Sequence, residues 1–291
     1  GRALKGQTLV VFEDVLYEDV SVGSHEDIND TDQSIYFPNI GTTATDKADG
    51  DHSITAAKQV TIVDKVEYKN LAPGEKHHVK GTLMDKATGK ALMVNGKEVT
   101  AEAEFTPDKS EGSVNVEFTF NAKNLGGKDL VVFEKMYDAN GNEVANHEDI
   151  NDEGQTISFV SIGTKASDAN TGSNLVEAST NMKIKDTVSY KNLVVGKTYT
   201  INGKLMDKET GKPALDDEGK EITSSVKFTA ESKNGTVDVI FEFSGVKLAG
   251  KPIVAFESLT YKGKEYAVHQ DIEDEDQTTL IPKVSTTASD K

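Results

Sequence analysis

The chain alternates hydrophobic and polar residues with a period of two along most of its length. In "SVNVEFTF", residues 113–120, Val114, Val116, Phe118 and Phe120 fall on one face and polar residues lie between them. The run "TVDVIFEF", residues 236–243, repeats this alternation. Because successive side chains of a strand point to opposite faces, both runs predict half-buried β-strands.

Other segments of the chain also have strand character. They are "HHVKGTLMD", "EVTAEAEF", "DLVVFEKMY", "EVANHEDI" and "QTISFVSI", and turn sequences such as "ATGK", "NGK", "LGGK" and "ANGN" separate them. No long stretch has a convincing helical period. About seven short strands in roughly 120 residues predict an all-β protein built from immunoglobulin-like β-sandwiches.

The pattern recurs with an interval of 122 residues. His25, His147 and His269 begin the related stretches "HEDINDTDQS", "HEDINDEGQT" and "HQDIEDEDQT", and 147 − 25 and 269 − 147 both equal 122. The same interval separates Gln33, Gln155 and Gln277, and also Thr42, Thr164 and Thr286. A unit of this length can enclose its own hydrophobic core, unlike solenoid repeats of about 20 to 50 residues, so we predict tandem domains.

The landmarks divide the chain into two full repeats and two fragments. We place the full repeats at residues 38–159 and 160–281. Residues 1–37 resemble the C-terminal part of a preceding repeat, since "LKGQTLVVFE" parallels "LGGKDLVVFE". Residues 282–291 resemble the first strand of a following repeat. We therefore expect the domains to be neighbours in a longer fibre of the same repeats.

Composition removes several classes of function. The net charge of −17, with no basic stripe, disfavours nucleic acid as a partner. No run of 18 apolar residues is present, which argues against membrane insertion. The absence of cysteine excludes disulfides and thiolate chemistry, so an extracellular protein of this sequence needs another stabilising device.

Two polar residues of each repeat are placed to react with each other. They are Thr42 with Gln155 and Thr164 with Gln277, and 155 − 42 and 277 − 164 both equal 113. They lie in the predicted first and last strands, and a fold that pairs its terminal strands brings the hydroxyl beside the carboxamide. The attack of one on the other needs a base, a donor to the carbonyl oxygen and an acid for the departing ammonia.

Glutamate, aspartate and histidine recur with them and suit those tasks. A glutamate and an aspartate that lie close together in a desolvated site cannot both ionise easily, so one tends to remain protonated and can polarise the carbonyl. Histidine titrates near neutral pH and can carry protons. The combination of "VVFE" or "VAFE", H-x-x-x-x-D-x-x-Q-T/S and "TTATD" or "TKASD" resembles the repeat domains of Gram-positive surface adhesins that form an internal Thr–Gln ester.

The resemblance implies the site residues position by position. Thr42 and Thr164 would be the nucleophiles, Gln155 and Gln277 the electrophiles. The assisting residues would be Glu134, His147 and Asp152 in the first repeat and Glu257, His269 and Asp274 in the second. Incomplete sites would contain Glu13, His25, Asp30 and Gln33 at one end of the chain and Thr286 at the other.

The residues leave two other stabilising devices open. The recurring lysines of "YKNL" and "LMDK" could form isopeptide bonds to Asn or Asp, and the acidic loop "DINDTD" could bind calcium, in a repeat with a ligand-binding role. The latter lacks the spacing of a known calcium loop, and we predict neither a metal nor a cofactor. Turnover of an external substrate is also disfavoured, because the electrophile is built into each repeat.

Taken together, the sequence and the resemblance predict a structural stalk segment of an extracellular, cell-wall-anchored adhesin. Each domain would be locked by an autocatalytic Thr–Gln ester that gives mechanical and proteolytic stability. The protein would not be an enzyme beyond a single self-cross-linking event. A host receptor would bind elsewhere in the parent protein.

Overall fold

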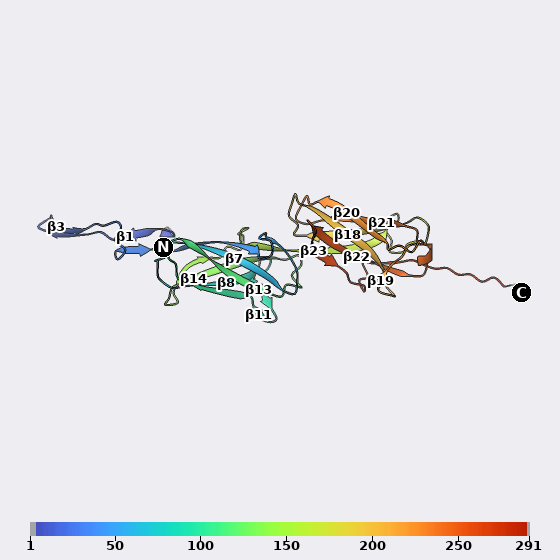
Figure 1. The fold of residues 1–291 in the computed structure, drawn as a ribbon, viewed down its shortest axis with the longest axis horizontal. Helices are drawn as coiled ribbons and strands as arrows, with labels where there is room; N and C mark the ends of the chain where they lie inside the picture. Colours follow the sequence, from blue (N-terminus) through green and yellow to red (C-terminus); the bar gives the residue numbers. More distant parts are fainter. Residues whose placement is uncertain (1–3, 290–291) are drawn as a thin grey trace. The chain divides into compact units, whose positions relative to one another are not determined.

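The computed structural model describes residues 4–289, which divide into two compact units (Figure 1). The first contains residues 4–52, 59–121 and 129–157, and the second contains residues 53–58, 122–128 and 158–289. The short segments 53–58 and 122–128, which the repeat interval places in the first full repeat, thus pack with the second unit.

Two facing sheets make up the sandwich of the first unit. One sheet has the order β13 (Gly112–Phe120), β7 (Val60–Lys69), β5 (Asn39–Asp46). The other contains β12 (Thr100–Phe105), β8 (His77–Asp85), β14 (Asp129–Tyr137) and β15 (Glu143–His147), with β9 (Lys90–Ala91) paired to β8. The strands β10 (Met93–Val94) and β11 (Lys97–Glu98) form a separate hairpin.

The second unit repeats this arrangement. Strands β16 (Thr156–Asp168), β17 (Met182–Lys191) and β21 (Gly235–Phe243) are adjacent in one sheet, and β6 (Ser53–Thr55) pairs with β16 in parallel. The opposite sheet contains β20 (Thr223–Thr229), β18 (Thr198–Asp207), β22 (Pro252–Tyr261), β23 (Lys264–His269), β24 (Thr278–Leu280) and β19 (Lys212–Pro213). A 3₁₀ helix, η2 (Val246–Leu248), precedes β22.

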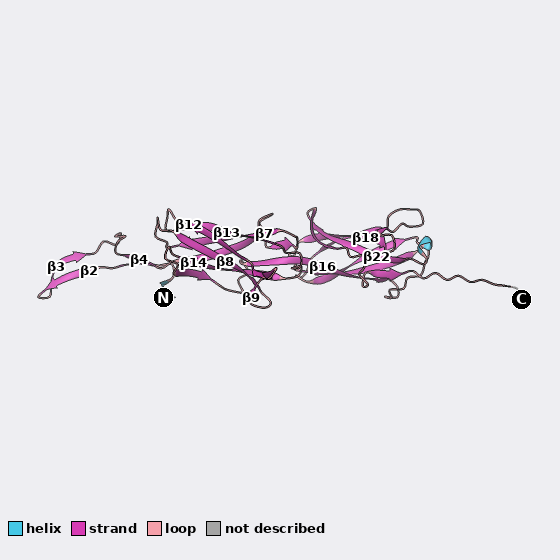
Figure 2. Cartoon of the chain, turned by 90° about the horizontal axis from the view of Figure 1, so that it is seen from below, coloured by secondary structure: helices cyan, strands magenta, loops and turns pink. Residues whose placement is uncertain are grey.

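Residues 4–37 form two small antiparallel pairs. Strand β1 (Thr8–Val10) pairs with β4 (Ser34–Tyr36), and β2 (Glu13–Tyr17) pairs with β3 (Val20–His25). Strands dominate the described residues, among which no α-helix occurs (Figure 2). The prediction of an all-β protein with immunoglobulin-like sandwiches is confirmed.

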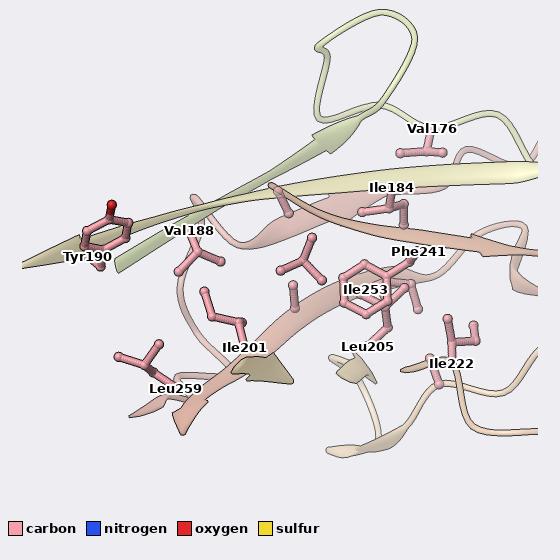
Figure 3. Packing of buried hydrophobic residues seen from close by; sticks show 14 of the residues in the cluster. Val176, Ile184, Val188, Tyr190, Ile201, Leu205, Ile222, Phe241, Ile253 and Leu259 are labelled. Carbon is pink, nitrogen blue, oxygen red and sulfur yellow. The ribbon is translucent and has the colours of Figure 1, made fainter. Parts of the chain in front are cut away.

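The apolar side chains of the alternating pattern fill the space between the sheets. In the second unit, Val188 and Phe241 from one sheet and Ile201 and Ile253 from the other gather in a single buried cluster (Figure 3). Glycine makes room for the central ring, because a Cβ atom at Gly203 would lie 2.6 Å from the Phe241 ring. The first unit repeats this contact one interval earlier, with Gly81 and Phe118.

Candidate cross-linking site

A carboxyl pair is buried between the sheets of the first unit. Glu134 comes from β14 and Asp64 from the facing strand β7, and neither side chain is exposed to solvent. Asp64 occupies an inward position of the alternating run "VTIVDKVEYK", where the neighbouring inward residues are apolar. The period-two backbone therefore forces a carboxyl into the core.

Burial controls the protonation of this pair. Loss of solvation raises the pKa of Glu134 to about 11, and the hydrogen bond and negative charge of Asp64 add to the effect. Burial also raises the pKa of Asp64. Since two adjacent buried carboxyls cannot both ionise, the pair holds a proton at neutral pH, and we place it on Glu134.

Thr42 and Gln155 reach the carboxyl pair from the terminal strands. The Thr42 hydroxyl, on β5, donates to Glu134 Oε2 over 3.2 Å. The buried Gln155 directly precedes β16, and its Nε2 donates to Asp64 Oδ1 over 3.4 Å. Its carbonyl oxygen Oε1 is buried with no hydrogen-bond partner. The nucleophile and the electrophile thus contact opposite members of one acid pair.

The loop that precedes Gln155 is built from aspartate turns. Asp149 Oδ1 accepts from the Asn151 amide at 2.9 Å, and Asp152 Oδ1 accepts from the Gly154 amide at 2.7 Å. The other oxygen of Asp152 lies 2.7 Å from His147 Nε2. The recurring spacing from His to Gln is therefore the length of two consecutive turns that close on the histidine.

The second unit contains the same residues with a different contact of the glutamine, which donates to the glutamate of the pair and not to the aspartate. Glu257 and Asp186 are buried, and burial raises the pKa of Glu257 to about 10 and that of Asp186 above its ordinary value. Gln277 Nε2 donates to Glu257 Oε2 over 2.8 Å and also contacts the Thr164 hydroxyl oxygen. The two reacting groups are therefore in direct contact here. His269 Nε2 lies 3.0 Å from Asp274 Oδ2.

The structure corrects the expected partner of the buried glutamate. The residues that form the desolvated pairs are Asp64 and Asp186, whereas we expected Asp152 and Asp274 in this role. Asp152 is partly exposed; burial opposes its ionisation, but hydrogen bonds from His147 and the Gly154 amide outweigh this and lower its pKa. Sequence analysis missed Asp64 and Asp186 although 186 − 64 is again 122 and each interrupts the apolar face of a strand.

The incomplete sites at the two ends of the chain are only partly assembled. His25 Nε2 lies 2.6 Å from Asp30 Oδ2, and Glu13 is opposite His25 in the pairing of β2 and β3. Glu13 is nevertheless exposed, in contrast to Glu134 and Glu257. Gln33 is half-buried, and Thr286 is exposed in the C-terminal segment. The His–Asp loop thus forms locally, whereas burial of the glutamate needs the opposite sheet.

The lysines of the isopeptide alternative lie away from the buried carboxyls. Lys69 and Lys191 of "YKNL" are exposed. Lys86 and Lys208 of "LMDK" interact with Thr156 Oγ1 at 3.0 Å and with Glu273 Oε2 at 3.6 Å. An isopeptide needs a lysine amine beside a buried Asn or Asp, and these positions do not supply one.

The described residues also offer no group of three or more His, Asp or Glu side chains arranged to hold a metal ion. The oxygens of the acidic loops accept hydrogen bonds within their own turns, as Asp27 does from Asn29 and Asp271 does from Glu273. None of the helices in residues 4–289 has the length and apolar character needed to cross a bilayer.

The fold and the site define a protein of tandem immunoglobulin-like domains, each with a threonine, a glutamine and a buried carboxyl pair at its centre. The chain belongs to the family of the T-Q ester bond containing domain, whose model matches residues 1–37, 38–159 and 160–280. The resemblance seen in the sequence is thereby confirmed. No curated protein sequence matches the chain.

A search of solved structures found distant similarities, among them these two. An adhesin from Mobiluncus mulieris that contains intramolecular disulfide, isopeptide and ester bond cross-links is 15% identical, with 78% of this chain and 81% of that chain covered and a TM-score of 0.36. The C-terminal domain of the Streptococcus agalactiae AgI/II polypeptide BspA is 10% identical, with coverage of 78% and 96% and a TM-score of 0.37. Similarities this distant carry no functional argument.

Proposed function

We propose that each full repeat joins its own threonine to its own glutamine through an ester. In the first repeat the Thr42 Oγ attacks Cδ of Gln155, the Oγ–Cδ bond forms and the Cδ–Nε2 bond breaks. The hydroxyl proton is transferred to the departing nitrogen, which leaves as ammonia. The reaction consumes no oxidant or cofactor, so the residues of the site supply every atom and proton that it needs.

The carboxyl pair supplies both proton acceptor and proton donor. Asp64, as the ionised member, provides the negative charge toward which the threonine proton moves through Glu134. As Glu134 takes the threonine proton, its own proton passes to Asp64, so the pair then holds two protons. The one on Glu134 can hydrogen-bond the carbonyl oxygen of Gln155, where negative charge develops in the transition state, and the other remains to be passed on. His147, aligned by Asp152, passes the proton on to the leaving nitrogen.

The observation that carries the proposal is the contact of Gln277 Nε2 with both Thr164 Oγ1 and the buried Glu257. A nucleophile, an electrophile and an acid are held together inside a core that excludes water. Because folding has already brought them together, the reaction avoids the entropy cost of a bimolecular encounter. The reaction consumes its own groups, so the domain is a single-turnover cross-linker and not an enzyme.

The cross-link suits a structural role in a stalk. The ester joins the first strand of a domain to its last, so tension on the ends is borne by covalent bonds. We infer a segment of an extracellular, cell-wall-anchored adhesin, whose neighbours are further repeats of the same fibre and whose host receptor is bound elsewhere in the parent protein.

Intact mass tests the proposal. Each ester releases one ammonia, about 17 Da, so the matured chain should weigh about 34 Da less than its sequence. The Thr42→Ala/Thr164→Ala double variant is the control and should match its own sequence mass. A mature protein without the deficit, or one about 1 Da heavier per site through hydrolysis of glutamine to glutamate, contradicts ester formation.

A further inference from the structure

A small backbone motif occurs three times at the interval of the repeats. In each copy a glycine amide donates to the carbonyl of a partner residue, and the amide of that partner donates back to the carbonyl of the residue after the glycine. The partner lies just after β4 in the first copy, within β16 in the second and just after β24 in the third. We refer to the two acceptors as a carbonyl pair. The pairs are Gln7 and Phe37, Lys128 and Phe159, and Lys251 and Ile281, with hydrogen bonds of 2.6 to 3.2 Å.

An asparagine side chain occupies the middle carbonyl pair. Asn192 Nδ2 donates to the carbonyl oxygens of Lys128 and Phe159, each at 3.2 Å. All three residues belong to the second compact unit. The amide nitrogen of asparagine carries two hydrogens, so one side chain satisfies both acceptors.

The turn around Asn192 fixes its side chain. The residue adopts a left-handed φ of 63°, which asparagine tolerates better than most residues, and its backbone amide donates to Asn234 Oδ1 at 3.0 Å. The following Leu193 is buried and hydrogen-bonded to the Lys233 carbonyl. The sequence "YKNL" thus forms a rigid turn that presents an amide.

The first repeat carries the same turn. Asn70, in the earlier "YKNL", has a φ of 58°, and Leu71 after it is fully buried. Asn70 lines one cavity together with Tyr36 and Pro38, the chain neighbours of Phe37. The first carbonyl pair therefore also has a "YKNL" turn beside it.

The third carbonyl pair, Lys251 and Ile281, differs because the described residues contain no third "YKNL" turn to cover it. The surface around it is apolar and uncovered. Leu175 is 53% exposed, whereas its equivalent one repeat earlier, Ser53, is 4% exposed. Val246 and Leu280 are also exposed. A position that is buried at one copy of the motif, and both apolar and exposed at the next, marks a surface that another element can cover.

We propose that the end of the second unit formed by Lys251, Ile281, Leu175, Val246 and Leu280 is a docking surface for the "YKNL" turn of a further repeat of this kind. The asparagine of that turn bridges the carbonyls of Lys251 and Ile281, and its apolar neighbours cover the exposed side chains. The partner's identity as another repeat rests on the proposed function, but the docking does not require an ester.

An extended chain tests the docking. A copy of residues 160–281 is appended after Ile281, which preserves the repeat interval and supplies a new "YKNL" turn. Hydrogen exchange of the Gly250 and Ile281 amides, the two donors of the carbonyl pair, is then compared with the original chain. Exchange should slow about tenfold, as expected for one added hydrogen-bonded contact.

Substitution of the added asparagine by glycine is the decisive variant. Glycine accepts the left-handed φ without strain but lacks the amide, so the turn is retained while the bridge is lost. Exchange at Gly250 and Ile281 should return toward the rate of the original chain. In the unextended chain, Asn192→Gly is the matched control and should accelerate exchange only at Gly127 and Phe159.

Two outcomes would overturn the docking proposal. One is an extended chain in which Gly250 and Ile281 exchange as in the original. The other is equal protection with and without the added asparagine. Intact mass of the same samples keeps the two proposals apart, because a chain with its ester deficit but without the protection contradicts the docking alone.

Discussion

Glu134 lies directly opposite His147 in the antiparallel pairing of β14 and β15. The same relationship joins Glu257 to His269, although the members of the first pair lie one position further apart along the chain. The hairpin turn absorbs the extra residue. Because opposed residues of an antiparallel pair share a face, the imidazole stays beside the carboxyl pair in both full repeats. In the mechanism that we propose, this is the route by which a proton leaves the buried acids.

Removal of the buried aspartate should disable one site and spare the other. Asp64→Asn replaces the ionised member of the first acid pair with a neutral group, so the threonine proton has no acceptor. We expect the mass deficit to fall from about 34 to about 17 Da, measured after correction for the substitution. Asp186→Asn should give the same loss from the second site. Retention of both ammonia losses in Asp64→Asn would show that the acid pair is dispensable.

The protonated glutamates should make the unlinked protein less stable as pH rises. The pKa of Glu134 is about 11 in the folded protein against an ordinary value of 4.5, and the Thr42→Ala/Thr164→Ala variant loses only a hydrogen bond that lowers this pKa. The folded variant therefore binds more protons than the unfolded chain between these values. The free energy of unfolding should therefore decrease from about pH 5 to about pH 9, by at most about 1.4 kcal/mol per pH unit for each site.

Denaturant titrations at several pH values measure this slope. Addition of Glu134→Gln and Glu257→Gln to the unlinked variant should flatten it, since glutamine does not titrate. An unlinked protein whose stability is constant or increases over this range would mean that the pairs carry no extra proton.

Loss of one link should reduce stability without unfolding the sandwich. The ester would join Thr164 to Gln277, which are separated by 113 positions. The chain-entropy estimate for a covalent loop of roughly this size is about 4 to 5 kcal/mol. Thr164→Ala should lower the melting temperature of the second domain, while the strand content seen by circular dichroism is retained. Thr286→Ala, at the same position of the motif, should change neither the mass deficit nor the melting temperature. Equal falls in melting temperature for the two variants would assign the loss of stability to the altered strand and not to the bond.

Gln33 and Thr286 should remain unlinked within this chain. At the spacing that joins Thr164 to Gln277, Gln33 has no threonine before it in this chain and Thr286 has no glutamine after it. Peptide mapping by tandem mass spectrometry should find two cross-linked peptides, Thr42 with Gln155 and Thr164 with Gln277. A third, joining Gln33 to Thr286, would indicate that the two fragments assemble between copies of the chain.

Chelation should leave the protein unchanged. The acidic loops use oxygens of Asp149 and Asp152 to close their own turns, which leaves no set of ligands in these loops directed at a common point. The melting temperature with EDTA should equal that without it to within a degree or two. A fall of several degrees, reversed by calcium, would restore the metal-binding interpretation of these loops.

The alternation of apolar and polar residues was sufficient to predict the strands and the sandwich. Successive side chains of a strand point to opposite faces, so the alternation is visible in the sequence whatever the overall composition. The segments "HHVKGTLMD" and "DLVVFEKMY" coincide with β8 and β14. The repeat interval also singled out Thr42, Gln155 and His147 as candidates, and the recurring motif "VVFE" or "VAFE" singled out Glu134. Whether these side chains meet depends on which strands face each other in the sandwich. The repeat interval alone does not give that information.

The partner of Glu134 could not be assigned in the same way. Asp152 was assigned from the recurring H-x-x-x-x-D-x-x-Q motif and the family resemblance, whereas Asp64 reaches the glutamate across the sandwich from β7, a strand distant in sequence. Residues that meet across two facing sheets have no fixed separation in the sequence. The usable signal was a charged residue at an inward position of an apolar face, repeated at Asp186.

The strand β16, Thr156–Asp168, begins directly after Gln155 and contains Thr164. Once both esters form, a pulling force therefore passes from one cross-link to the next through the short segment from Gln155 to Thr164, and the chain enclosed by each link carries none of it. Without the bonds, one repeat could extend to about 400 Å of chain; with them, the segment between links is limited to about 30 Å. A fibre built in this way would behave as a nearly inextensible tether, whose contour length changes only when an ester is hydrolysed.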